Sequence, residues 1–157
     1  ARDRALAAIA ERSTTKKSNE RKTNKNKFEL ISGAQLRGED LSHSSASGAY
    51  LVKANLLDAK LQNSNLRSTN LRWADLEGAN LMKANLREAN LRGANLRKTI
   101  LRGADLMKAD LRGVDLRKTK KLTQKQIDYA CVDKSTKLPP HIKRLNTYPG
   151  CKFWKDK

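Results

Sequence analysis

Leucine recurs at every fifth position from Leu51 to Leu116, fourteen times without a miss. The residue two places before nearly every leucine is small, with Val114 as the exception, and the residue directly before it is usually Asn or Asp. Neither the 3.6-residue period of an α-helix nor the two-residue period of a strand fits a strict repeat of five. The pattern favours a solenoid whose chain turns a corner after each five-residue unit, so that every leucine points to a common axis.

The segment ANLMKANLREANLRGANLRK at 79–98 shows the unit most clearly. This A(N/D)LXX pattern resembles the signature of the pentapeptide-repeat family, and the match runs from about residue 29 to 118. The resemblance implies an all-β solenoid, a right-handed quadrilateral parallel β-helix with four units in each coil. The repeat region would form about four and a half coils, stacked at the sheet spacing of about 4.8 Å.

The first coil departs from the repeat. Glu39 and Ser44 hold places of the small residue, Tyr50 and Lys60 hold Asn/Asp places, and Ala46 replaces a leucine. We therefore expect this coil to be distorted, or to be shaped by something that covers it.

The segments on either side of the repeat region lack its period. Residues 1–28 form a basic, polar extension in which 4–12 can form a short helix. Thr123 and Gln126 form a capping-box pattern, which predicts a helix over about 123–131 that covers the last coil. The rest of 119–157 is expected to be an extended basic tail. The stretch TQKQIDYACVDKSTKLPP at 123–140 resembles a tail common behind bacterial pentapeptide repeats.

The charge of the chain is strongly basic, with a formal net charge of +18. Residues 1–28 carry +6, residues 29–118 carry +5 and residues 119–157 carry +7. This balance favours an acidic protein surface, nucleic acid or an anionic membrane surface as partner. No apolar run approaches the roughly 18 residues of a membrane span, so none is predicted. An initial Ala is compatible with removal of Met, with signal-peptide cleavage or with a shortened chain.

The sequence contains little that could support catalysis. His43 and His141 are the only histidines, and no Cys–His pair, Ser–His–Asp set or glycine-rich phosphate loop is suggested. We therefore predict no enzyme activity, no catalytic residues, no cofactor, no metal and no small-molecule substrate.

The two cysteines leave the compartment open. Cys131 and Cys151 are too far apart for a CxxC metal motif, so they either form a disulfide or remain free thiols. A disulfide would stabilise the fold by roughly 3 kcal/mol and would indicate the periplasm, a lumen or the exterior. Free thiols would indicate the cytoplasm.

The outward positions of the repeat carry the candidate binding residues. Residues twenty apart should stack on one face, which places several cations and aromatic residues together. On one face these are Arg72, Arg92, Arg112, Lys53, Trp73, Tyr50 and Val52; on the next they are Arg97, Arg117, Lys98 and Lys118. Arginine beside an aromatic ring can hold an anionic partner by charge and by stacking. The alternative is a solvated basic surface whose arginine stems cover the coil.

The leading functional prediction is a structural or protein-interaction module that docks to acidic partners in a larger assembly. One alternative is sequence-independent binding of nucleic acid through the arginine and lysine columns and the basic tails. A less favoured alternative is modulation of topoisomerases. The members of the family that do this are acidic, whereas this chain has the opposite charge.

Overall fold

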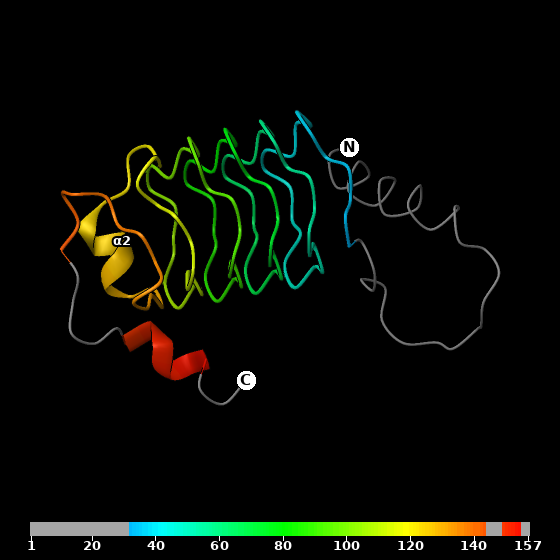
Figure 1. Ribbon diagram of the computed structural model, residues 1–157. Helices are drawn as coiled ribbons and strands as arrows, with labels where there is room; N and C mark the ends of the chain where they lie inside the picture. Colours follow the sequence, from blue (N-terminus) through cyan, green and yellow to red (C-terminus); the bar gives the residue numbers. More distant parts are fainter. Residues whose placement is uncertain (1–31, 144–148, 155–157) are drawn as a thin grey trace.

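A computed structural model describes residues 32–143 and 149–154. The predicted extension 1–28, with its helix at 4–12, lies outside these residues, as do parts of the tail at 144–148 and 155–157. The repeat region winds into a rod of stacked coils, with α2 at one end (Figure 1).

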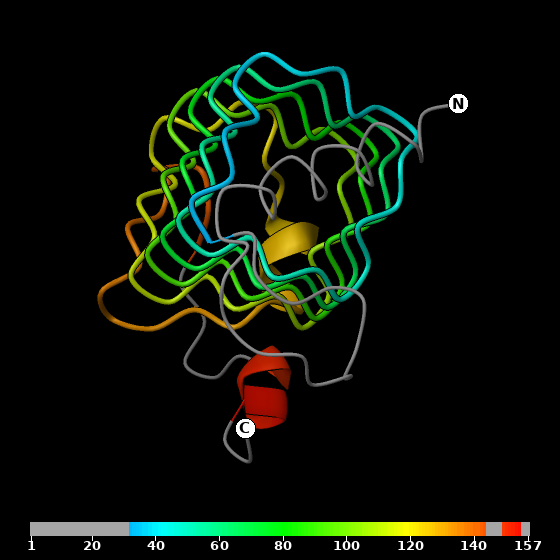
Figure 2. The ribbon, with the colours of Figure 1, turned by 90° about the vertical axis from the view of Figure 1, so that its right-hand side faces the viewer.

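The coils stack in a parallel register of twenty residues. Single residues pair with their counterparts one coil later, as Asn65 does with Asn85 and Asn70 with Asn90. A view along the rod shows the successive coils superimposed (Figure 2). Each unit contributes one bridge because the chain turns before a longer strand can form. The architecture is the expected right-handed quadrilateral parallel β-helix.

The recurring residues of the repeat make recurring hydrogen bonds at the corners of the coil. The carbonyl of Leu51 accepts the N–H of Ala54 at 3.1 Å, which closes a four-residue turn. The third residue of such turns has a positive φ, +56° at Lys53 and +71° at Gly93, as in type II turns. The Asn or Asp place supplies a side-chain acceptor, and Asn90 Oδ1 accepts the N–H of Arg92 at 3.2 Å.

The core is a stack of leucines with small residues between them. Leu71, Leu81 and Leu91 are completely buried, and Ala74 and Ala84 lie beside the leucine stack with almost no exposure. Where Thr69 takes a small place, its hydroxyl donates to the carbonyl of Leu66 at 2.7 Å. The buried core of the described residues thus consists of leucine and small residues, and backbone hydrogen bonds join one coil to the next.

The described part of the first coil is regular, so the expected distortion was wrong there. Asp40 and Tyr50 pair with the residues twenty positions later, as in the central coils. Ser44 fits its place because its hydroxyl donates to the carbonyl of Leu41 at 2.6 Å. The ladder is made by backbone groups, so irregular side chains do not interrupt it.

The helix α2 spans Gln124–Asp128 and is shorter than the predicted 123–131. The N–H of Thr123 donates to Gln126 Oε1 at 2.9 Å, as the capping pattern indicates. Gln126 Nε2 donates to the carbonyls of Leu101 (2.7 Å) and Ala104 (2.9 Å), which fixes α2 on the last complete coil.

The helix ends early because the chain rejoins the coil ladder. Cys131 pairs with Asp110, and Lys137 pairs with Asp115, so part of the predicted tail continues the β-helix. A 3-10 helix, η2 (Pro149–Trp154), then lies beside the rod near α2 (Figure 1).

Candidate functional site

One face of the β-helix brings together the predicted arginine column. Arg72, Arg92 and Arg112 occupy the same place in successive coils, and the N–H of Trp73 donates to the carbonyl of Arg92 at 3.2 Å. A cavity of about 300 Å³ opens on this face. It is lined by Arg72, Trp73, Arg92, Gly93, Arg112, Gly113, Asp133 and Ser135.

Trp73 forms an aromatic platform at this cavity. Its side chain is 50% exposed, and the Arg72 Cζ atom lies 4.3 Å from its ring centroid, a cation–π contact. The ring lies against Gly93, where an added Cβ would stand 2.7 Å from Trp73 Cδ1. Gly93 therefore gives the indole the space it occupies, and Arg72 is held beside it.

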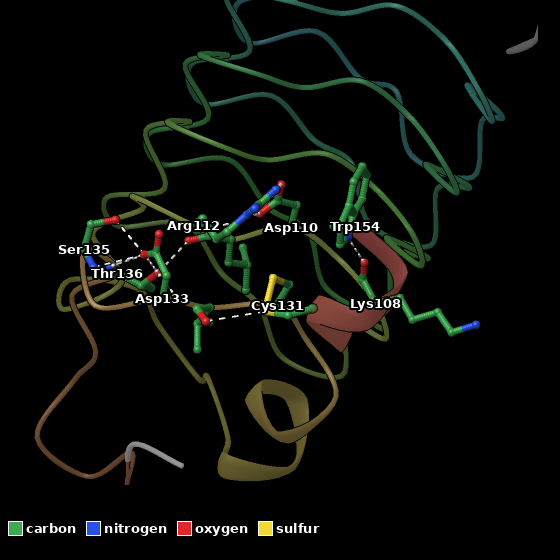
Figure 3. The surroundings of a disulfide bond; sticks show 11 residues. Lys108, Asp110, Arg112, Cys131, Asp133, Ser135, Thr136 and Trp154 are labelled. Atoms are coloured by element: carbon green, nitrogen blue, oxygen red, sulfur yellow. Dashed lines mark hydrogen bonds and ion pairs between the residues drawn. A yellow bond between two sulfur atoms is a disulfide. The ribbon is translucent and has the colours of Figure 1, made fainter. Parts of the chain in front are cut away.

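Arg112 is already neutralised within its own coil. Its Nε and Nη2 atoms donate to the two carboxylate oxygens of buried Asp110 at 2.8 and 2.6 Å (Figure 3). The hydrogen bond to Asp110 raises the pKa of Arg112 above its ordinary value. This bidentate pair uses two of the five N–H donors of Arg112 and offsets its charge.

On the second predicted face, two of the four cations are paired with carboxylates. Arg117 binds Asp115 through two hydrogen bonds of 2.9 and 2.6 Å, which lower the pKa of Asp115 to about 2. Lys98 Nζ lies 2.9 Å from Glu77 Oε1, and this hydrogen bond lowers the pKa of Glu77. Only Arg97 and Lys118, both exposed, form no ion pair on this face within the described residues.

The remaining predicted residues of the first face differ in exposure. Tyr50 is 43% exposed, and Lys53 is exposed. Val52 is only 7% exposed, so it offers little surface to a partner in this structure.

Arg72 and Arg92 have no carboxylate partner within the part of the chain that the structure describes. Arg92 is exposed, whereas Arg72 is half-buried and its Nε–H is a buried donor without an acceptor among the described residues. The predicted column therefore contains two arginines that are not engaged in ion pairs and one that is.

The sequence carries a signal for this difference that the repeat analysis missed. Arginines that follow Asp-Leu are paired, as at Asp110–Arg112 and Asp115–Arg117. Arg72 and Arg92 follow Asn-Leu. An Asp in the Asn/Asp place can form an ion pair two residues later, whereas the neutral amide cannot.

Sequence reasoning also missed two residues that line the cavity, Asp133 and Ser135. Both are labelled in Figure 3. Burial raises the pKa of Asp133, but hydrogen bonds from Ser135 and Thr136 outweigh it and hold the pKa below its ordinary value. These residues belong to the tail, where no five-residue period indicates which face they join.

The C-terminal end of the rod is held by a disulfide between Cys131 and Cys151 (Figure 3). Trp154 of η2 donates its indole N–H to the carbonyl of Lys108 at 2.7 Å. Two distant segments, the tail and the last coils, are thereby joined.

The described residues contain no group of three metal-ligating side chains. In the same residues, no helix has the length and apolar character that a membrane span requires. The arrangement on the arginine face is suited to binding anions by charge and stacking.

The chain is similar to known proteins in both sequence and structure. A family model described as pentapeptide repeats matches in overlapping blocks at residues 31–67, 47–81, 64–103 and 84–120. The crystal structure of alr5209, a pentapeptide-repeat protein from Nostoc Pcc 7120, is similar at 30% identity. That match covers 82% of this chain and 95% of alr5209, with a TM-score of 0.60.

Two further solved structures are similar in sequence. HetL, a pentapeptide-repeat protein involved in heterocyst differentiation regulation in Nostoc sp. strain PCC 7120, is 27% identical, with 70% of this chain and 60% of HetL covered and a TM-score of 0.43. AT2G44920, from the Arabidopsis thaliana thylakoid lumen, is 25% identical, with 64% and 62% covered and a TM-score of 0.34. Among curated proteins, none matches the sequence. Its repeats, its coils and its similarity to alr5209 show that the chain belongs to the pentapeptide-repeat family.

Proposed function

We propose that this chain is a non-enzymatic interaction module, a rigid basic β-helix that docks to an acidic protein surface in a larger assembly. The observation that carries the proposal is the pair Arg72 and Arg92, which lie beside exposed Trp73 without carboxylate partners in the described residues. Arginine and tryptophan are the residues most enriched at the energetic centres of protein interfaces.

The scaffold supports this role because it holds the face in place before binding. Arg72 and Arg92 lie on coils joined by backbone bonds such as Leu71 N–H to the Asn90 carbonyl at 2.8 Å. A preorganised surface loses less conformational freedom on binding than a flexible one.

The test is an affinity pull-down from the native source at low and high salt, with and without nuclease. It compares the native chain with Arg92→Glu and with Arg102→Glu. Arg102 is an exposed arginine ten residues later, on the opposite face of the rod, so its reversal changes the net charge equally. We expect a nuclease-resistant partner that Arg92→Glu weakens at least tenfold and Arg102→Glu hardly affects. Equal loss in both variants would contradict docking through this face.

Sequence-independent binding of nucleic acid is the second candidate. Half-exposed Trp73 beside arginine favours it, because bases stack on such rings while cations contact phosphates. In the same pull-down, loss of all partners after nuclease treatment would support this candidate over a protein partner. An anionic membrane surface would instead give salt-sensitive sedimentation with vesicles that contain phosphatidylserine.

A further inference from the structure

We infer that Arg92, the Arg72–Trp73 pair and Gly93 form a discrete binding site for one side-chain carboxylate of an extended acidic peptide segment. The inference rests on the proposed function. It names the residues that would bind an acidic partner and the chemical group that they would bind.

Arg92 is the group that would bind the carboxylate. Of the three arginines that line the cavity, Arg112 is engaged by Asp110 and Arg72 lies over Trp73. Arg92, between them, is exposed and forms no ion pair within the described residues. Its planar guanidinium can bind a carboxylate through two parallel hydrogen bonds.

The surroundings of Arg92 leave room for a peptide. Gly113 lines the same cavity and carries no side chain that would fill it, whereas the space over Gly93 is taken by the Trp73 ring. The exposed part of the Trp73 ring offers an apolar contact for the residue next to the carboxylate. An extended segment can therefore place its acidic side chain on Arg92 and its neighbour on Trp73.

Arg72 provides a separate indication that the site is incomplete. Its Nε–H is buried and lacks an acceptor within the described residues, whereas buried donors in proteins are normally paired. A ligand oxygen that enters this cavity beside Arg92 would supply an acceptor for the Arg72 guanidinium, which lines the same cavity.

The charge distribution favours a peptide carboxylate over a nucleic-acid strand. A strand needs a series of cations along its backbone, because each phosphate contact contributes to affinity. On this face the series is interrupted, since Asp110 neutralises Arg112 one coil beyond Arg92. A single carboxylate needs only the Arg92 position.

Asp110 and Asp115 each form an ion pair with the arginine two residues later. This pairing suggests a test that leaves Arg92 itself unchanged. Asn90→Asp should capture Arg92 as Asp110 captures Arg112, while the acceptor for the Arg92 N–H is retained. Asn80→Asp is the matched control, because it adds the same charge on another face and is followed by Met82 rather than by arginine.

The measurement is an NMR titration of the full chain in which the indole N–H signal of Trp73 is followed. Trp73 and Trp154 are the only tryptophans, so Trp154→Phe identifies the signal. The probes are a blocked peptide with a central glutamate flanked by leucine and serine, its glutamine counterpart, and a short oligothymidylate. Circular dichroism melting curves check that each variant is folded.

We expect the glutamate peptide to shift the Trp73 signal saturably, with at least tenfold weaker binding of the glutamine peptide. Asn90→Asp should weaken the glutamate peptide at least tenfold, and Asn80→Asp less than twofold. Equal effects of the two substitutions, tighter binding of the oligothymidylate at Trp73, or no shift at all would each overturn the inference. A partner that still needs Arg92 in the pull-down would then preserve the proposed function without the carboxylate site.

Discussion

At the scale of single residues, the third position of each turn has a positive φ and carries either glycine or an outward side chain. Trp73 has φ +56° and Gly93 has φ +71°, so both lie in the left-handed region. For a residue with a side chain this conformation costs about 1–2 kcal/mol relative to glycine. A tryptophan at this position is therefore kept at some cost, and its ring is placed against the glycine of the next coil.

Replacement of Gly93 separates the backbone effect from the contact with Trp73. In Gly93→Ala, the new Cβ would lie 2.7 Å from Trp73 Cδ1, so the ring must move. We expect a loss of about 2 kcal/mol in the free energy of unfolding and a change in Trp73 fluorescence. Urea denaturation followed by fluorescence measures both.

Gly103→Ala is the matched control for this substitution. Gly103 has a similar φ of +68°, but its added Cβ would meet Lys83 Cγ at an ordinary 3.5 Å. Only the backbone cost should appear, about 1 kcal/mol, with unchanged Trp73 fluorescence. Equal losses in the two variants would show that the indole does not lie against Gly93.

At the scale of elements, the C-terminal end is a composite of α2, the returning strand residues and η2. The carbonyl of Cys131 accepts the N–H of Leu111 at 2.8 Å, so the disulfide begins inside the ladder. An added Cβ at Gly150 would lie within 3 Å of the Tyr129 and Ala130 backbone, which shows how closely η2 approaches. The disulfide and this close contact together fix the tail on the rod.

Removal of the disulfide should therefore destabilise the C-terminal end. Cys131 and Cys151 are separated by 20 residues, and closing a loop of this length stabilises a fold by about 3 kcal/mol. We expect Cys151→Ser to lower the free energy of unfolding by about this amount in guanidinium denaturation. A dithiol reductant should produce the same loss in the native chain and no further loss in the variant. A native chain unaffected by reductant while its thiols become reactive would contradict the prediction.

At the scale of the whole molecule, each coil contacts only its neighbours, as in other solenoids. Leu81 and Leu86 donate backbone hydrogen bonds in central coils that are covered on both sides, whereas Leu36 and Leu41 belong to the first described coil. Opening should begin where a coil has fewer neighbouring contacts.

Hydrogen exchange measures this gradient directly. We expect the amides of Leu81 and Leu86 to exchange at least 100-fold more slowly than those of Leu36 and Leu41, because terminal coils open at lower free energy. Mass spectrometry of short peptic fragments is sufficient to compare these regions. Uniform protection along the rod would show that the β-helix opens only as one unit.

The five-residue period predicted the axis, the leucine core and the column that contains Arg72, Arg92 and Arg112. It did not predict which of these arginines would be neutralised, because that depends on the carboxylates nearby: Asp110 pairs with Arg112, whereas Asn90 offers Arg92 only a neutral amide. The place of Asp133 could not be predicted either, since the chain rejoins the ladder after α2 with a register of its own. Periodicity determines which face a residue occupies, whereas side-chain partners and the tail depend on local chemistry.

The quadrilateral coil also makes the surface sensitive to changes in chain length. Loss of one five-residue unit between Arg72 and Arg92 would leave the core pattern intact but would move Arg92 a quarter of a turn around the rod. Loss of four units would shorten the rod and return every later residue to its original face. An insertion or deletion of five residues thus rotates the later surface residues around the rod. An insertion or deletion of twenty residues changes only the length of the rod.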